Sequence, residues 1–192
     1  MQRYSDCPQI LRDFLAYHES IKGQSPLTIS EYHLDLRMFL RFMKLMRSDM
    51  PVNTPLEAID IRDIDLNFIR GIETSDIFDF LSYLATDRVY ESGSPAPDHG
   101  ISAKSRARKL SAIKSFYKYL TVRTKLLEEN PVADLEYPKI RRSLPKYLTM
   151  EQSAALLQSV SGQNQVRDYA ILMLFLNCGI RRSELVGLNL TD

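Results

Sequence analysis

Apolar residues recur at spacings of three and four along most of this 192-residue chain. That repeat places side chains on one face of an α-helix, so it limits the fold to packed helices. The clearest stripe follows Ser25 and Pro26, where a serine can cap free backbone N–H groups and proline suits the first helical position. Its members are Ile29, Tyr32, Leu36, Phe39, Leu40 and Met43. We therefore expect a mainly α protein in which such stripes bury one another.

The same pattern predicts four other helices, at about residues 8–20, 75–87, 102–122 and 166–176. The last of these is apolar nearly all round, as in a helix that is buried on every side. Gly179 suits the left-handed conformation that closes such a helix. Before it, Thr149 and Gln152 can form a capping box, in which each side chain satisfies the other residue's backbone N–H group.

Three segments interrupt the helical repeat. Residues 48–75 are acidic and are broken by two prolines and a glycine, while residues 91–100 are rich in glycine, serine and proline and are expected to form an exposed loop. Residues 138–147 are basic and contain two prolines, each of which disfavours helix at the residue before it. We therefore expect a helical domain over 1–137, a basic linker over 138–147 and a second domain over 148–192.

Composition excludes several classes of protein. An apolar fraction of 44% is enough to form a core. No apolar run approaches the roughly 20 residues that a membrane helix needs, and residues 1–8 lack the apolar core of a signal peptide. Cys7 and Cys178 lie far apart and form no metal-spaced cluster, which favours free thiols in a reducing cytoplasm. The chain has no P-loop, dinucleotide fingerprint or zinc spacing, so we expect a cytoplasmic protein without a metal or a small-molecule cofactor.

The net charge of +1 hides an uneven distribution. Residues 1–100 hold 10 Lys/Arg and 16 Asp/Glu, residues 101–147 hold 12 and 4, and residues 148–192 hold 3 and 4. The middle segment therefore carries +8, and the segments before and after it carry −6 and −1. A strongly basic segment in a near-neutral chain indicates a polyanion partner, although an ordinary solvated face would also account for the charge.

The helix expected at 102–122 concentrates this charge on one face. Its apolar side consists of Leu110, Ile113, Phe116, Tyr117 and Leu120. The opposite arc of roughly 120° holds Lys104, Arg108, Ser111, Lys114, Ser115 and Lys118. Lysine and arginine neutralise phosphates, and small serines let a helix approach a nucleic acid closely. We therefore expect this face to bind DNA; the alternative is a solvent-facing stripe, which the lack of acidic residues at i+4 disfavours.

Arg181 follows Gly179 and is expected near the start of a further helix. A helix N-terminus offers free N–H groups and a positive dipole end to a phosphate. The guanidinium adds a rigid fork of donors that matches phosphate oxygens and could stabilise charge during phosphoryl transfer. Taken alone, a surface arginine or an ion pair with Glu184 is the simpler explanation of the residue.

The wider sequence adds a resemblance to a known family. Residues 179–185, Gly-Ile-Arg-Arg-Ser-Glu-Leu, resemble the first conserved box of the tyrosine site-specific recombinases, the phage-integrase-like family. Residues 167–171 resemble the buried helix before that box, and residues 143–149 resemble the start of the family's catalytic domain. Residues 109–120 are similar to the family's last core-binding helix, and 130–139 to the linker after it. The family's earlier helix is matched by Thr28, Tyr32, Asp35, Leu36, Phe39 and Phe42.

The resemblance implies a helical, SAM-like core-binding domain of the phage-integrase type, followed by the first helices of a catalytic domain. It is most similar to the Xer-like subgroup, which resolves chromosome dimers, although transposon integrases share these features. The complete enzyme would cut one DNA strand with a tyrosine hydroxyl, form a 3′-phosphotyrosyl bond and reseal the strand in a partner duplex. Energy stays in the phosphodiester, so neither ATP nor a metal is implied. The implied partners are duplex DNA and other recombinase protomers in a synaptic assembly.

Individual roles follow from the same resemblance. Arg181 matches the first catalytic arginine, which grips the scissile phosphate, and Glu184 matches a residue that supports the box. Arg182 stands where the family usually has an aliphatic residue. DNA contacts are expected from the basic helix face and from four further residues, Thr28, Arg141, Arg142 and Lys146.

The sequence also departs from the family pattern. The family's catalytic lysine, its histidine–arginine box and its nucleophilic tyrosine lie downstream of the first box, and no tyrosine follows Arg181 here. Tyr117, Tyr119 and Tyr169 do not match the nucleophile's motif. We therefore expect a truncated chain that binds DNA without cutting it. The alternatives are a naturally short, non-catalytic DNA-binding protein or partner of a full-length recombinase, and a helical protein-interaction module.

Overall fold

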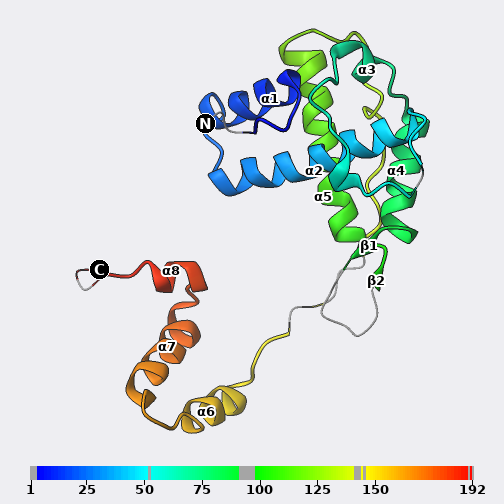
Figure 1. The fold of residues 1–192 in the computed structure, drawn as a ribbon. Coiled ribbons are helices and arrows are strands. Elements are labelled where there is room, and N and C mark those ends of the chain that lie inside the picture. Colours follow the sequence, from blue (N-terminus) through cyan, green and yellow to red (C-terminus); the bar gives the residue numbers. More distant parts are fainter. Residues whose placement is uncertain are drawn as a thin grey trace. The chain divides into compact units, whose positions relative to one another are not determined.

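The computed structural model describes residues 4–51, 53–90, 98–140, 144, 146–189 and 191. The chain divides into two compact units, Met1–Arg141 and Arg142–Asp192, and each is described by itself. The fold is mainly α, as the helical periodicity predicts (Figure 1). No helix in the described ranges is long and apolar enough to cross a membrane. The expected domain limits at 137 and 148 stay predictions, because compactness does not show that either part folds alone.

Four long helices build the first unit. They are α1 (Gln9–Ser20), α2 (Pro26–Met46), α4 (Thr74–Thr86) and α5 (Ala103–Lys118). Helix α2 packs against the other three, and α4 also packs against α5 (Figure 1). Shorter elements connect them, namely the 3₁₀ turn η1 (Leu56–Ala58), α3 (Leu66–Arg70) and the π-helical turn η2 (Tyr119–Arg123). The described part of the acidic segment 48–75 therefore contains short elements up to Glu73, and α4 begins at Thr74.

The predicted apolar stripes form the core of this unit. On α2, every member of the stripe is buried except Tyr32, which is half-buried. Aromatic rings join the helices: Phe14 of α1 meets Phe116 of α5 edge-on at 5.4 Å, and Phe39 of α2 meets Phe80 of α4 at 5.3 Å. Each fully buried side chain of this size contributes roughly 1.5–3 kcal/mol to folding. The stripes therefore explain both why the helices form and how they pack.

Two serines begin the helices of this unit as capping residues. The Ser25 Oγ accepts a hydrogen bond from the Thr28 backbone N–H at 3.3 Å, and Pro26 occupies the first position of α2. The Ser102 Oγ accepts from the Ser105 backbone N–H at 3.1 Å at the start of α5. The predicted start of α2 at Ser25-Pro26 is therefore confirmed, and its physical basis is the satisfied backbone donor.

The loop expected over residues 91–100 is partly wrong. Strands β1 (Val89–Tyr90) and β2 (Asp98–His99) pair as an antiparallel hairpin, while residues 91–97 lie outside the described residues. Gly100 closes the hairpin with a φ of +70°, and a Cβ there would lie 1.9 Å from the Ala85 carbonyl oxygen. Two residues per strand are too few for a periodicity to be visible, so the sequence reads as a loop.

The second unit contains α6 (Met150–Gln158), α7 (Gln165–Cys178) and α8 (Arg182–Val186). The capping box before α6 is confirmed, because Thr149 N–H donates to Gln152 Oε1 at 2.9 Å and Gln152 N–H donates to Thr149 Oγ1 at 3.2 Å. Gly179 ends α7 with a φ of +61°, the left-handed conformation that was expected.

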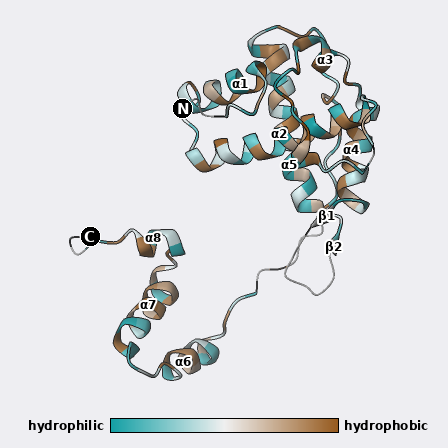
Figure 2. Cartoon of the chain, viewed as in Figure 1, coloured by the Kyte–Doolittle hydropathy of each residue, from teal (hydrophilic) through white to brown (hydrophobic). Residues whose placement is uncertain are grey.

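Helix α7 is not buried, which corrects the expectation for residues 166–176. None of the described residues of the second unit is buried, although Figure 2 shows apolar residues along α7. The physical reason is geometric: within this unit α7 packs mainly against the nine-residue α6, and two short helices cannot cover an apolar surface that extends all round. Composition predicted the helix correctly, but burial depends on neighbours that α7 does not have in this unit.

Candidate nucleic-acid interface

Helix α5 separates an apolar face from a polar one, as the helical wheel predicts. Its inward residues are fully buried, and they include Leu110, Ile113, Phe116 and Tyr117. On the outward side, Lys104, Arg108, Ser111 and Lys118 are exposed, while Lys114 and Ser115 are half-buried. The proposed DNA-contacting residues of α5 thus lie on one accessible side of the helix.

Two basic residues in the middle of α5 are held by acidic residues of α2. Arg108 forms an ion pair with Glu31 and places its guanidinium 2.9 Å from Asp35 Oδ2. Lys109 Nζ donates to Asp35 Oδ1 at 2.6 Å, and both of these side chains are buried. The charges of Arg108, Lys109, Glu31 and Asp35 cancel. This network explains why Lys109 lies beside the apolar edge of the helix: its charge is satisfied by a carboxylate from another helix.

Lys114 is tethered to the segment that follows η2. Its ammonium donates to the Ala133 carbonyl oxygen at 3.3 Å and lies 5.3 Å from the centre of the Tyr137 ring. Lys104 and Lys118, in contrast, make no ion pair with any described residue. The basic face of α5 therefore contains both engaged and unengaged cations, which the sequence alone does not distinguish.

A hollow of about 270 Å³ lies where α1, α2, α5 and η2 meet. Three cationic side chains line it, Lys22, Lys118 and Arg123, together with Tyr17 and Tyr119. No acidic residue is among its described lining residues. A concave surface with cations and no carboxylates concentrates positive potential, because low-dielectric walls focus the field. We call these five residues, with His18 and Ser115, the basic hollow.

His18 and Ser115 form the floor of the basic hollow. His18 Nδ1 lies 2.9 Å from Gln24 Oε1, and its Nε2 lies 3.4 Å from Ser115 Oγ. Burial lowers the pKa of His18, so the ring is neutral at pH 7. Because Gln24 Oε1 can only accept, Nδ1 carries the proton and Nε2 accepts from the Ser115 hydroxyl. Ser115 is thus oriented by the histidine rather than pointing freely to solvent.

The remaining expected DNA contacts occupy different settings. Thr28 is half-buried in the first turn of α2, and its hydroxyl lies 3.0 Å from Ser25 Oγ. Lys146 is exposed. Arg141 and Arg142 lie outside the described residues. Sequence reasoning missed Lys22 and Arg123, because they belong to a loop and to the π-helical turn, and only the fold brings them beside Lys118.

Arg181 is the N-cap residue of α8, as expected from its place after Gly179. Its backbone N–H donates to Glu184 Oε2 at 2.7 Å, and its guanidinium donates to Glu184 Oε1 at 2.9 Å. These two hydrogen bonds lower the pKa of Glu184. The ion pair that the sequence offered as the simpler explanation is therefore present, yet 82% of the Arg181 side chain is exposed. Glu184 orients the arginine without enclosing it.

Tyr117 and Tyr119 are poorly placed to act as nucleophiles. Tyr117 is fully buried, its hydroxyl lies 3.4 Å from the Ile69 carbonyl oxygen, and desolvation raises its pKa strongly. Burial also raises the pKa of Tyr119. A phenol that resists ionisation attacks a phosphate slowly, because the phenolate is the better nucleophile.

Comparison with known proteins supports the same family. Residues 11–124 match the family model described as the phage integrase N-terminal SAM-like domain. The chain is 42% identical over 185 residues to tyrosine recombinase XerC of Caldanaerobacter subterraneus subsp. tengcongensis. The aligned region covers 96% of this chain and 49% of that protein. XerC of Myxococcus xanthus is 36% identical over 185 residues, which cover 95% of this chain and 51% of that protein. XerD of Halalkalibacterium halodurans is 30% identical over 184 residues, which cover 95% of this chain and 52% of that protein.

The chain spans about half the length of these curated relatives. No solved structure gives a significant match. The family model covers most of the first unit, whose helices and caps follow the pattern that the resemblance implied. The chain therefore belongs to the phage-integrase-like tyrosine recombinases and is Xer-like within them.

Proposed function

We propose that this chain binds duplex DNA as the core-binding part of a tyrosine-type site-specific recombinase. The observation that supports this most is the basic hollow, whose three cations are unpaired among the described residues and adjoin the exposed face of α5. Such an arrangement suits the phosphate backbone, which supplies most of the affinity in DNA binding. The hydroxyl groups of Ser111 and Ser115 add neutral donors that can contact phosphates without further charge.

We propose further that the whole protein breaks and rejoins DNA through a 3′-phosphotyrosine, in an assembly with other recombinase protomers. Chromosome dimer resolution in the cytoplasm is the role that fits the Xer-like relationship. Arg181, held by Glu184, would contact the non-bridging oxygens of the scissile phosphate and stabilise its developing charge. No cofactor is needed, because the phosphodiester energy is kept in the protein–DNA bond.

The 192-residue chain by itself is expected to bind DNA without forming a covalent adduct. No tyrosine follows Arg181 in this sequence, and Tyr117 is inaccessible. Orienting the phosphate without orienting a nucleophile accelerates strand cleavage little, because alignment of the two reacting groups supplies much of the rate enhancement. A trapped protein–DNA band on a nicked substrate would contradict this expectation.

The domain limits are part of the proposal. Residues 1–137 should fold without the rest, because the described core residues of the first unit extend no further than Leu135. Limited proteolysis is expected to cut within 138–147 and to leave a stable N-terminal fragment. Rapid digestion of that fragment to peptides would show that the boundary is misplaced.

The direct test is the salt dependence of duplex binding, measured by fluorescence anisotropy. In Lys118→Ala, the slope of log K against log salt should flatten by roughly one unit, as expected for one lost phosphate contact. Arg70→Ala is a matched control, because Arg70 is exposed on α3 and does not line the basic hollow. Binding that is insensitive to salt in the unmodified chain would favour the protein-interaction module instead.

A further inference from the structure

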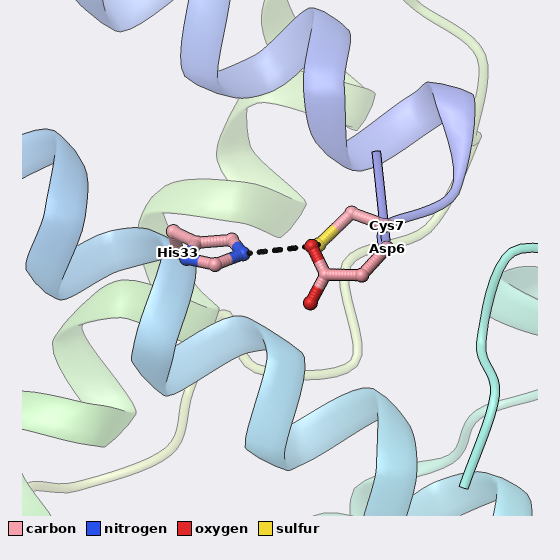
Figure 3. Close-up of side chains that lie close together, drawn as sticks. All are labelled: Asp6, Cys7 and His33. Atoms are coloured by element: carbon pink, nitrogen blue, oxygen red, sulfur yellow. Dashed lines mark hydrogen bonds and ion pairs between the residues drawn. The ribbon is translucent and has the colours of Figure 1, made fainter. Parts of the chain in front are cut away.

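The segment before α1 brings three potential metal ligands together with α2. Asp6 and Cys7 lie in that segment and His33 lies on α2, and one ligand atom from each is within 4.8 Å of the others. Figure 3 shows the His33 ring directed at the Asp6 carboxylate, with the Cys7 sulfur beside it. The cluster lies outside the basic hollow and shares no residue with it.

The distances within the cluster are longer than good hydrogen bonds. His33 Nε2 lies 3.5 Å from Asp6 Oδ1, and Cys7 Sγ lies 3.7 Å from the same oxygen. Tetrahedral zinc has bonds of about 2.0–2.3 Å, which places its ligand atoms roughly 3.3–3.8 Å apart. Both distances to Asp6 Oδ1 fall in this range, and the third pair, Cys7 Sγ and His33 Nε2, lies within 4.8 Å.

Burial provides a second, independent observation. Cys7 is fully buried and His33 is 9% exposed. His33 Nε2 is shielded from solvent and has no hydrogen-bond partner among the described residues. Its nearest polar neighbour, Asp6 Oδ1, lies 3.5 Å away, at the long limit of a hydrogen bond, whereas buried polar atoms of native proteins nearly always have a close partner. A metal ion bound to its lone pair would supply the missing partner.

Neighbouring residues hold the ligands in place. Arg37 donates to Asp6 Oδ2 at 2.6 Å, which leaves Oδ1 available on the side of His33. Arg12 donates to the Cys7 carbonyl oxygen at 2.7 Å and fixes the backbone of that residue. The Tyr4 ring packs against His33 with 4.4 Å between ring centres. Hydrogen bonds of this outer kind commonly orient the ligands of protein metal sites.

We propose that Asp6, Cys7 and His33 bind a divalent cation of the zinc class, with water as the fourth ligand. A thiolate, an imidazole and a carboxylate together suit Zn²⁺, which accepts sulfur, nitrogen and oxygen ligands in tetrahedral geometry. Asp6 is partly exposed, so a water molecule can reach the metal from that side. On binding, Cys7 Sγ releases its proton to solvent, and Sγ, Nε2 and Oδ1 each donate an electron pair to the metal.

The consequence for the fold is a link between the chain before α1 and helix α2. Cys7 belongs to the core of the first unit, and a metal there would join it covalently to His33. No sequence motif indicates this site, because Cys7 and His33 do not have the short spacing of common zinc motifs. This proposal does not rest on the DNA-binding proposal, and neither result decides the other.

The test uses the full 192-residue chain carrying Cys178→Ser, which removes the exposed thiol and leaves the cluster intact. Cobalt(II) should bind in equimolar amount under reducing conditions and give a thiolate-to-metal charge-transfer band. Zinc(II) should displace the cobalt, and calorimetry in buffers of different ionisation enthalpy should show the release of one proton. Thermal unfolding should shift upward when zinc(II) is added.

Three further substitutions in the Cys178→Ser chain test whether Asp6, Cys7 and His33 bind the metal, separately from any effect on folding. His33→Gln and Cys7→Ser should lose the charge-transfer band and weaken zinc(II) binding by roughly 100-fold or more. Asp6→Asn keeps the side-chain shape at a partly exposed position, so it should remain folded even if Cys7→Ser does not, and it should also weaken binding. His99→Gln is the control and should bind as the parent does. Absence of an equimolar cobalt complex, or equal binding by His33→Gln and the parent, would overturn the proposal.

Discussion

The middle and the end of α5 carry positive charge in different ways. In the middle, Arg108 and Lys109 are neutralised by Glu31 and Asp35 of α2. At the end, Lys118 is exposed and faces the basic hollow without a carboxylate among the described lining residues. In the sequence the two parts look alike, as parts of one basic stripe.

Whether a basic side chain has an acidic partner determines whether it is available to bind DNA. A charge that is neutralised inside the protein contributes to packing and orientation, whereas an unpaired charge remains available to a polyanion. Asp35 is 2% exposed, so the middle of α5, at Arg108 and Lys109, functions mainly as a structural joint between α2 and α5. The end of α5 is where we expect most of the electrostatic attraction to DNA.

The largest effect is expected at the structural joint. Asp35→Asn leaves the buried Lys109 ammonium without a counter-charge, and removing one partner of such a pair destabilises a protein by about 3–5 kcal/mol. Glu31→Gln is the matched control, because its ion pair with Arg108 is solvent-exposed and should contribute less than about 1 kcal/mol. Urea unfolding monitored by circular dichroism measures both. Equal losses for the two variants would mean that the joint is no more important than a surface pair.

The next effect contrasts the middle and the end of α5 in DNA binding. Lys118→Ala should flatten the salt dependence by roughly one unit, whereas Arg108→Ala should change it less, since Glu31 and Asp35 already neutralise that guanidinium. Anisotropy titrations over a salt series measure both slopes. A larger change for Arg108→Ala would show that DNA displaces the acidic residues and that the middle of α5 is the main contact.

A smaller change is expected when the restraint on Arg108 is loosened. Glu31→Gln removes one of its two acidic partners and adds one net positive charge to the surface near α5. Duplex affinity at low salt should therefore rise a few-fold at most, because Asp35 continues to hold the guanidinium. Asp79→Asn gives a control with the same charge change on the exposed side of α4. An equal rise in both variants would indicate only a general effect of net charge.

Features of this structure that depend on residues close together in the sequence were predictable, and features that depend on contacts between distant residues were not. The stripe on α2, the caps at Ser25 and Thr149 and the left-handed Gly179 depend on neighbours within a few residues, and all were predictable. The burial of α7 was predicted wrongly, because it depends on what packs against the helix. Expectations for site residues stay predictions, since position on a helical face does not reveal a partner such as Asp35.

The basic hollow shows the same limit for a functional site. Lys118 was expected on the DNA-binding face from periodicity, but Lys22 and Arg123 come from two other elements and join it only in the folded chain. The acidic partners of Arg108 were sought at i+4 of the same helix, whereas they come from α2. Long-range ion pairs of this kind leave no local pattern in a sequence.

The smallest effect concerns His18, which supports the end of α5 through Ser115. Burial lowers the pKa of His18 below its ordinary value of 6.5, while its hydrogen bond to Gln24 acts in the opposite direction and the charge of Lys22 in the same one. As the pH falls below about 6.5, the unfolded chain binds a proton at this histidine more readily than the folded chain. Stability should therefore decrease as the medium becomes more acidic.

His33 is shifted in the same direction, so the two contributions must be separated. In metal-free protein, urea midpoints between about pH 7.5 and about pH 5.5 should fall less steeply for His18→Gln than for the parent, and His33→Gln should remove a further part of the slope. His99→Gln, at an exposed position, should leave it unchanged. If His18→Gln keeps the full slope, His18 binds protons equally in the folded and unfolded chains, and its burial contributes nothing to the pH dependence of stability.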